Sequence, residues 1–459
     1  MDDLLDRLER LPMSRVQTRL LFMGGLGYTF DAMDGAVIAF VLAAIIKPWH
    51  LTNGETGLLG SALLIGYLVG AFFSGTLGDL IGRRTIVVWS LVFYSVATLI
   101  SAFAGTWQFF FVFRVLAGIG TGAQSAIIAP YLSEFINSKV RGRYVGALAG
   151  FFSFGFVFAA LLGYFVIPTS PVGWRLVIVI TALPVLLLIW WRRGLPESPR
   201  WLLARNRAQD ATAVVEQLET QVMNATGRSL PPVESVVSSQ ESLGGVGGTF
   251  KENLASLWRG RTARTTIMMW VLWFAITFAY YGFFTWIPTL LVKSGLTITK
   301  SFSYSIIIYL AQIPGYYSAA WLNERLGRKY TIVLYMALGA LSALLMALFH
   351  TNVAIIVFGF CLSFFMNGSY AGIYAYTPEV YATSYRTTGM GVASAVGRVG
   401  GILAPLIIGF TYARIGFGGV FTVSTVVLAV GVILVAWLGI NTRSKTLERI
   451  MAEQLQLKL

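Results

Sequence analysis

The chain has 459 residues, of which 56% are hydrophobic and 12% are charged, and its mean hydropathy is +0.72. A soluble domain carries about 25% charged residues, so this composition excludes a soluble globular protein. The formal net charge of +14, taken alone, would also suit a nucleic-acid-binding protein. A single cysteine, Cys361, and two histidines exclude a disulfide framework and a multi-ligand metal centre, and we expect no cofactor and no metal.

Long apolar runs dominate the sequence, and each is long enough to cross a bilayer, because ~30 Å of hydrocarbon needs about 20 helical residues. The twelve runs lie at 22–46, 56–78, 85–104, 107–130, 144–167, 174–191, 265–291, 301–322, 330–349, 352–377, 387–411 and 417–440. Continuous runs favour helices, since the strands of a membrane barrel would alternate with a period of two. The sequence therefore predicts an all-α membrane protein with twelve transmembrane helices.

Lysine and arginine are unevenly distributed between the segments that connect these runs. If both termini are cytoplasmic, 27 of the 34 lie in cytoplasmic segments, and five lie outside: Lys47, Arg175, Lys293, Lys300 and Arg414. Such an asymmetry predicts cytoplasmic N- and C-termini. It also explains the net charge by membrane orientation, so we expect the lipid bilayer and no nucleic acid as a partner.

Charged motifs recur at an offset of 245 residues. Gly78-Asp79-Leu80-Ile81-Gly82-Arg83-Arg84 corresponds to Asn323-Glu324-Arg325-Leu326-Gly327-Arg328-Lys329, and Glu134 and Arg141 recur as Glu379 and Arg386. A shared offset indicates a parallel repeat, which is a transporter architecture. We therefore predict a six-helix bundle at 1–192, a cytoplasmic interdomain loop at 193–263, and a second six-helix bundle at 264–459.

The acids and arginines of these motifs are candidates for a cytoplasmic gate. We expect four groups that bridge helix ends: Asp79 with Arg83 and Arg84, Glu134 with Arg141, Glu324 with Arg328, and Glu379 with Arg386. Such bridges would keep the inner side closed while the outer side is open. Topogenic charge alone would explain the arginines but not the acids repeated at one offset.

Three motifs carry a resemblance to the major facilitator superfamily that covers essentially the whole chain. The stretch Gly75–Arg84 resembles its loop motif between the second and third spans. Arg114 followed by Gly118, Gly120 and Gly122 resembles the fourth span of sugar porters and organic-ion transporters, and Pro196–Leu202 resembles the segment after their sixth span. The resemblance implies two pseudo-symmetric six-helix bundles.

A narrower resemblance connects the chain with bacterial niacin permeases and aromatic acid:proton symporters, which are related to the synaptic-vesicle-glycoprotein-like transporters. Its first span contains Phe30-Asp31-Ala32-Met33-Asp34, and similar stretches lie at 280–282, 312–316, 374–379 and 397–401. The chain departs from the niacin permease pattern at Gln124, where that pattern has a glutamate. The resemblance implies uptake of a small carboxylate with protons.

Four charged residues lie deep within the apolar runs: Asp31, Asp34, Arg114 and Arg398. A charge at the bilayer centre costs ~2.5–3.5 kcal/mol on insertion scales, so each must face a cavity or a partner. Counting from the span ends places Asp34 and Arg114 at nearly the same level, ~18–20 Å from the inner face. We expect Asp31, Asp34 and Arg114 to couple transport to protons, and the alternative is a static ion pair that only orients helices.

Arg398 lies near the middle of its span, where its planar guanidinium could hold a substrate carboxylate. The alternative is a partnership with Asp31 that leaves no anion site. Polar and aromatic residues at a similar level could complete a site for a planar acid: Gln312, Tyr281, Trp286, Asn367, Tyr370 and Tyr374. Each could also be an ordinary packing or interface residue.

These observations together predict a monomeric secondary transporter in a bacterial cytoplasmic (inner) membrane. It would take up a small organic carboxylate, nicotinate-like or another aromatic acid, with protons and by alternating access. The alternatives are an organic cation or sugar transporter of the same fold and a non-transporting substrate sensor. We expect no enzyme, because no nucleophile–histidine arrangement and no metal set occurs at one depth.

Overall fold

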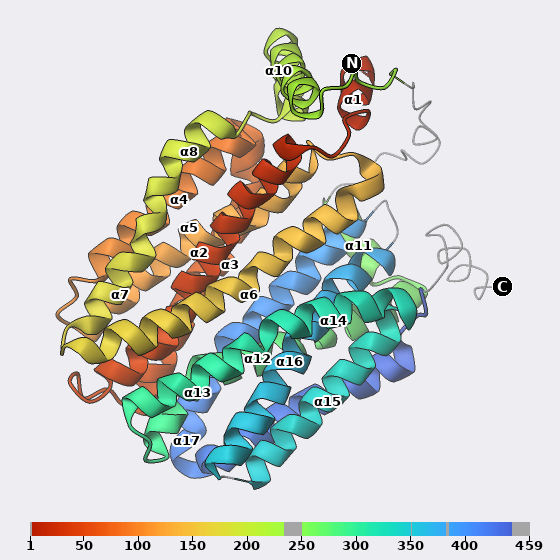
Figure 1. The fold of residues 1–459 in the computed structure, drawn as a ribbon. Coiled ribbons are helices and arrows are strands. Elements are labelled where there is room, and N and C mark those ends of the chain that lie inside the picture. The colour runs from red at the N-terminus through yellow and green to blue at the C-terminus, as the bar shows by residue number, and fades with distance from the viewer. Residues whose placement is uncertain (1, 234–249, 350, 382–384, 443–459) are drawn as a thin grey trace. The chain divides into compact units, whose positions relative to one another are not determined.

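The computed structural model describes the chain except for residue 1 and the segments 234–249, 350, 382–384 and 443–459 (Figure 1). The described residues form helices and no strand. The long helices are α2 (Arg15–Ile45), α3 (Asn53–Ile81), α4 (Arg83–Ser101), α5 (Trp107–Ser133), α6 (Ser138–Val166), α12 (Gly260–Lys293), α15 (Arg328–Leu348), α16 (Asn352–Tyr376) and α17 (Arg386–Leu438). The shorter ones are α1 (Asp2–Glu9), α7 (Gly173–Ala182), α8 (Leu187–Gly194), α9 (Pro199–Ala204), α10 (Ala208–Thr226), α11 (Phe250–Leu257), α13 (Ile298–Leu310) and α14 (Gln312–Arg325).

Ten helical segments in the described part of the chain are long and apolar enough to cross a membrane. The last of them, α17, covers two predicted crossings. They meet at Gly416, where the backbone is not helical, with φ 62° and ψ −167°. The predicted crossing at 301–322 is divided between α13 and α14, which meet at Ala311. All twelve predicted crossings therefore have helical counterparts, and the all-α membrane fold is confirmed.

The chain packs into two compact units, each containing most of one predicted bundle. Unit 1 comprises residues 1–37, 62–159 and 170–239, and unit 2 comprises 38–61, 160–169 and 240–459. Unit 2 thus includes the C-terminal ends of α2 and α6 and the first turns of α3. Within it, Ser61 donates a hydrogen bond of 2.7 Å to the Ile402 carbonyl on α17. The division into bundles at 192 and 264 stays a prediction.

Glycines allow α3 and α5 of unit 1 to pack with their backbones in contact. A Cβ on Gly118 or Gly122 of α5 would lie within 3.0 Å of the Leu63 or Tyr67 carbonyl of α3. Gly66 of α3 meets the backbone of α5 in the same way. No side chain fits between two helices at this distance, so the glycine repeat after Arg114 is a packing feature that fixes the depth of the arginine.

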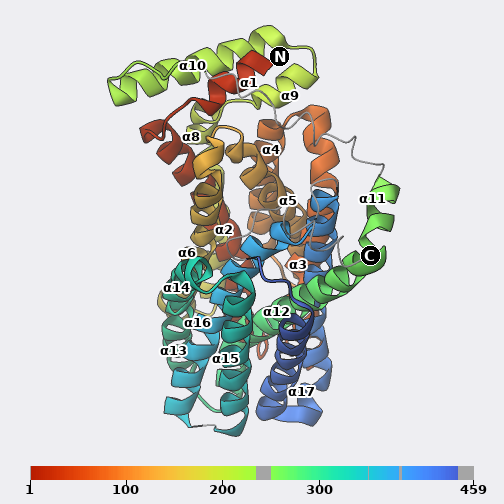
Figure 2. The ribbon, with the colours of Figure 1, turned by 90° about the vertical axis from the view of Figure 1, so that its right-hand side faces the viewer.

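Helix α1 is bound to α10 at one end of unit 1 (Figure 2). Arg7 donates to both carboxylate oxygens of Glu219, at 3.1 and 2.6 Å, and Arg10 donates to the same carboxylate at 2.6 Å. Partial burial favours a higher pKa for Glu219, but the hydrogen bonds and charges of the two arginines outweigh it, and the pKa of this carboxyl is lowered from its usual value.

Candidate functional site

Asp34 on α2 and Arg114 on α5 form a fully buried ion pair in unit 1. Arg114 Nη1 donates to Asp34 Oδ1 at 2.9 Å, and Nη2 donates to the Asp34 backbone carbonyl at 2.7 Å. Both side chains are 0% exposed. The hydroxyls of Thr98 on α4 and Thr181 on α7 also donate to this carboxylate, at 3.4 and 3.2 Å. The predicted pairing is confirmed as a contact, and its role in proton coupling stays a prediction.

The second acid of α2, Asp31, lies one turn before Asp34 and is 4% exposed. Gln124 on α5 donates to Asp31 Oδ1 through Nε2 at 3.3 Å. Asp31 Oδ2 and Gln124 Oε1 are both buried and have no hydrogen-bond partner within the described part of the chain. Two buried acceptors without donors are costly, whereas a proton on Asp31 would supply a donor at this place.

Arg398 on α17 lies beside an aromatic cluster of unit 2. Its guanidinium lies close enough to the Tyr370 hydroxyl of α16 for its positive charge to act on that group. A Cβ on the preceding residue, Gly397, would lie 3.1 Å from Thr277 Oγ1 and from Trp273 Cε3 of α12. This glycine thus lets α17 approach α12 closely next to Arg398.

The aromatic rings of this cluster come from α12 and α16. The Tyr280 ring lies edge-on to Tyr370 at a centroid distance of 5.1 Å and to Tyr281 at 5.4 Å. Tyr370 and Tyr374 are stacked at 6.1 Å, and Tyr374 lies edge-on to Trp273 at 5.2 Å. The predicted residues Tyr281, Tyr370 and Tyr374 are therefore brought together with the Arg398 side of α17.

Two amide side chains border the same cluster. Gln312 at the start of α14 accepts a hydrogen bond of 2.9 Å from the Tyr280 hydroxyl through Oε1. Asn367 on α16 donates to the Gln312 backbone carbonyl at 2.7 Å. Gln312 is 0% exposed, and its Nε2 has no hydrogen-bond partner among the described residues. This buried amide is an unused donor next to the aromatic ring of Tyr280.

Trp286, which was expected in this site, belongs to another cluster. Its ring nitrogen donates to the Pro405 carbonyl at 3.3 Å, and its ring stacks on Tyr412 at 6.3 Å. Lys293 Nζ lies 4.5 Å from the Tyr412 ring centroid and 5.5 Å from that of Trp286. Trp286 therefore packs α12 against α17 near the lysine that ends α12.

Three residues of α12 that the sequence reasoning did not select line the cluster: Trp273, Thr277 and Tyr280. Thr277 Oγ1 is 3.1 Å from the Tyr370 hydroxyl, which donates to it, and Trp273 donates to Thr377 Oγ1 at 3.1 Å. Their spacing of four and three residues places them on one helix face. That periodicity, followed from Tyr280 towards the N-terminus, could have identified them.

The charged motifs form equivalent ion pairs in the two units. Arg83 pairs with Glu134 in unit 1, and Arg328 pairs with Glu379 at 2.9 Å in unit 2, at the shared offset of 245 residues. Gly82 and Gly327, directly before α4 and α15, both have positive φ, at 103° and 90°. The internal repeat inferred from the sequence thus extends to the backbone conformation and to the side-chain pairing.

The pairing within these motifs differs from the expectation in two places. Arg141 does not reach Glu134: it binds Glu9 of α1 at 2.6 Å and donates to the Ile136 carbonyl, while Glu134 binds Arg83 and accepts from Ser198. Its equivalent Arg386 likewise donates to the Tyr381 carbonyl, at 3.3 Å. The expected pair of Glu324 and Arg328 is present at 3.6 Å.

Two gate residues, Arg84 and Asp79, lie outside these pairs. The backbone N–H of Arg84 donates to Glu197 at 3.1 Å. The side chain of Asp79 lies outside the described part of the structure, so its expected pairing with Arg83 and Arg84 stays a prediction. Among the described residues, no group of three or more His, Cys, Asp or Glu could hold a metal ion.

A repeated helical fold with buried charges inside its spans is typical of a membrane transporter. The chain belongs to the sugar (and other) transporter family, whose model matches residues 24–453. It is 40% identical over 449 residues to the niacin transporter NiaP of Acinetobacter baylyi, covering 98% of this chain and 99% of that protein. It is 34% identical to the putative niacin/nicotinamide transporter NiaP of Bacillus subtilis, covering 94% and 98% of the two chains.

Solved structures show the same fold. The inward-open conformation of the xylose transporter XylE from E. coli superimposes with a TM-score of 0.76 over 95% of this chain and 99% of that chain, at 17% identity. The family consists of membrane transporters, so the chain is a transporter and not an enzyme.

Proposed function

We propose that the chain takes up a small organic carboxylate, nicotinate or a close relative, across the cytoplasmic membrane of a bacterium. The observation that carries this proposal is the cluster of Arg398, aromatic rings and the unused Gln312 amide in unit 2. The relative from Acinetobacter baylyi is named as a niacin transporter, and its likeness extends over nearly the whole chain.

The chemistry of nicotinate fits the groups of this cluster. Its carboxylate would bind the Arg398 guanidinium, whose fork matches two carboxylate oxygens. Its flat ring would pack against Tyr370, Tyr281 or Tyr374, and its ring nitrogen would accept the hydrogen bond that Gln312 Nε2 can donate. Benzoate has the same carboxylate and ring but no nitrogen acceptor, and it should bind less well because it leaves the Gln312 donor unpaired.

Proton coupling is assigned to the buried acids of unit 1. Protonation of Asp34 would remove the charge that Arg114 neutralises, and the pair would then have two states of different stability. Asp31, with its unpaired oxygen next to Gln124, is a second place for a proton. In alternating access, the repeated bundles would rock around the midplane, with both termini in the cytoplasm.

Uptake of labelled nicotinate into proteoliposomes tests the substrate assignment. Arg398→Ala is expected to abolish uptake, and Arg398→Lys to restore only part of it, because an ammonium lacks the bidentate fork. Arg414→Gln removes the same charge from an exposed position of α17 and should transport normally. Normal nicotinate uptake by Arg398→Ala would refute the anion site.

The same vesicles separate the alternatives. Uptake of an organic cation or a sugar, but not nicotinate, by the wild-type protein would replace the proposed substrate class. Binding of nicotinate without flux would indicate a sensor.

A proton gradient tests the coupling. Asp34→Asn is expected to lose accumulation driven by an inward gradient while it still exchanges external for internal nicotinate. Accumulation equal to that of the wild type would remove Asp34 from the coupling mechanism, without affecting the substrate assignment.

A further inference from the structure

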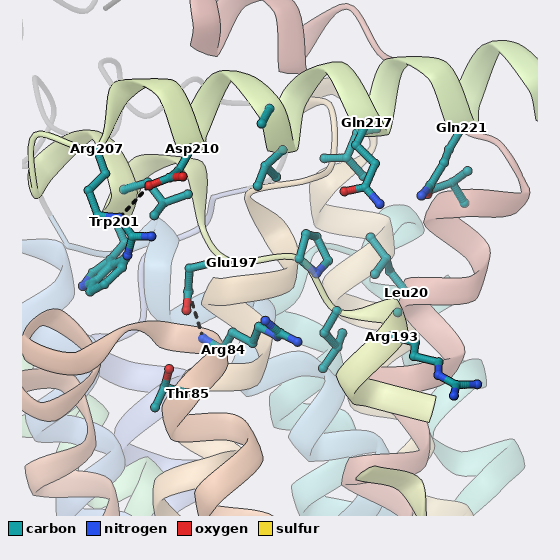
Figure 3. A pocket seen from close by; sticks show the side chains of 18 of the residues that line it. Leu20, Arg84, Thr85, Arg193, Glu197, Trp201, Arg207, Asp210, Gln217 and Gln221 are labelled. Carbon is teal, nitrogen blue, oxygen red and sulfur yellow. Dashed lines mark hydrogen bonds and ion pairs between the residues drawn. The ribbon is translucent and has the colours of Figure 1, made fainter. Parts of the chain in front are cut away.

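Unit 1 contains a cavity of about 580 Å³ between α10 and the adjoining ends of α2, α4 and α8 (Figure 3). It is separate from the ion pair of Asp34 and Arg114, and none of its residues belongs to the aromatic cluster of unit 2. Its lining includes the apolar side chains of Leu20, Leu195 and Leu218. This volume lies within the ~300–1,000 Å³ typical of small-molecule sites.

Arginines from separate elements line the cavity. Its lining includes Arg19 of α2, Arg84 of α4, Arg193 of α8 and Arg207 before α10, with Glu197 and Asp210 as its only acids among the described residues. Four arginines against two carboxylates leave a formal excess of two positive charges. Such an excess, gathered from four elements, favours a doubly charged anion.

Both acids already have donors of their own. Glu197 Oε1 accepts from the backbone N–H of Arg84 at 3.1 Å and of Ser198 at 2.9 Å. Asp210 pairs with Arg207 at 2.7 Å (Figure 3). Their charges are therefore compensated locally, and they oppose an incoming anion less than isolated carboxylates would.

The polar groups are placed by the local structure. A Cβ on Gly194, at the end of α8, would lie 2.5 Å from Met23 Cε and 2.9 Å from Arg19 Nη2, so this glycine leaves room for both side chains at the cavity wall. Gln217 and Gln221 are four residues apart on α10 and extend towards the cavity from one face of that helix (Figure 3). Their amides add neutral donors to the cavity lining.

We propose that this cavity binds a phosphate group carried by a larger molecule. Arginine forks and amide donors suit phosphate oxygens, and the volume leaves room for an organic part beside the leucines of the lining. The phosphate could belong to a soluble metabolite or to a lipid headgroup, since Arg19 and Arg84 lie within one or two turns of the start of their spans. Either ligand would join the connecting helix α10 to three membrane helices.

Binding to the full-length purified protein tests the site. In detergent, AMP and inorganic pyrophosphate are titrated by calorimetry, and in nanodiscs the retention of phosphatidylglycerol is compared with that of phosphatidylcholine by native mass spectrometry. Binding of AMP or pyrophosphate without selective lipid retention identifies a soluble ligand, and selective retention of phosphatidylglycerol identifies a lipid. Both results support the phosphate site.

Three variants assign the binding to this cavity. Arg19→Gln/Arg193→Gln should weaken the dissociation constant at least tenfold, because it removes two charge-assisted contacts. Gly194→Ala keeps every charge but displaces Met23 and Arg19, and should also weaken binding. Gln217→Leu/Gln221→Leu removes two amide donors from exposed positions of α10 and should weaken binding. It keeps the proposal testable if a variant within a span is unstable.

The control removes two arginines that do not line the cavity. Arg200→Gln/Arg228→Gln has the same net charge as the double arginine variant, and both positions are exposed. It should bind within twofold of the wild type. Absence of binding by every probe, or equal weakening in the control and the cavity variants, would overturn the proposal.

Discussion

The buried pair of Asp34 and Arg114 allows a quantitative test of its contribution to stability. Asp34→Asn removes the compensating charge from an arginine that is 0% exposed, so solvent cannot screen the charge that remains. Breaking a buried pair on one side costs about 3–5 kcal/mol. We expect the lower part of this range, because Arg114 Nη2 keeps its 2.7 Å bond to the Asp34 backbone carbonyl after the substitution.

The second half of the test is a double-mutant cycle. Arg114→Gln alone leaves the carboxylate uncompensated and should also lose about 3 kcal/mol or more. The double variant Asp34→Asn/Arg114→Gln buries no charge, so its loss should fall short of the sum of the single losses by about 2–3 kcal/mol.

The free energy of unfolding in mixed detergent micelles measures these changes. Asp210→Asn is the matched control, because it breaks a pair with Arg207 at 2.7 Å in which both side chains are 54% exposed. Such an exposed pair contributes about 0–1 kcal/mol. If Asp34→Asn were no more destabilising than Asp210→Asn, or if the two single losses added without coupling, the reasoning about the buried charge would be wrong.

Three further predictions concern other parts of the fold. The pKa of Glu219 is lowered in the folded protein, so the stabilisation that its carboxylate contributes is full above the usual value of 4.5 and is lost as pH falls through the folded value. Glu219→Gln should therefore have a lower melting temperature than the wild type at pH 7, and the difference between the two proteins should be smaller at pH 4. Gly118→Ala should prevent folding or lower the yield of monodisperse protein, because its Cβ would meet a backbone carbonyl. In Gly142→Ala the added Cβ has no atom within 4 Å, so this control should be neutral or stabilising by up to ~1 kcal/mol in a melting experiment. Arg328→Gln should lower the free energy of unfolding by about 1–3 kcal/mol, because it leaves the half-buried Glu379 carboxylate without its ion pair. Glu324→Gln should lower it by less than ~0.5 kcal/mol, because the Glu324 side chain is 76% exposed.

The features predictable from the sequence are those that depend on distance along a single helix. Counting residues from the span ends placed Asp34 and Arg114 at one depth, and the two side chains meet. The same reasoning could have separated Trp286 from Tyr281, because five residues correspond to a rotation of about 140° around the helix.

Features that depend on contacts between elements distant in sequence were not predictable. Glu134 binds Arg83 on another helix instead of Arg141, which follows it in its own part of the chain. The partner of Arg7 is Glu219, 212 residues away. Neither contact leaves a periodic pattern in the sequence, since it arises from the path of connecting segments between helices.

The glycine contacts between α3 and α5 have a practical consequence. Helices whose backbones touch along several turns have no layer of side chains between them that could slide. The segments in contact, 63–70 of α3 and 115–122 of α5, should therefore move as one rigid body during the transport cycle. Two spin labels, one on the exposed face of each helix, would keep a constant separation whatever the conformation. Such a pair would serve as an internal ruler against which the distances of every other labelled pair can be calibrated.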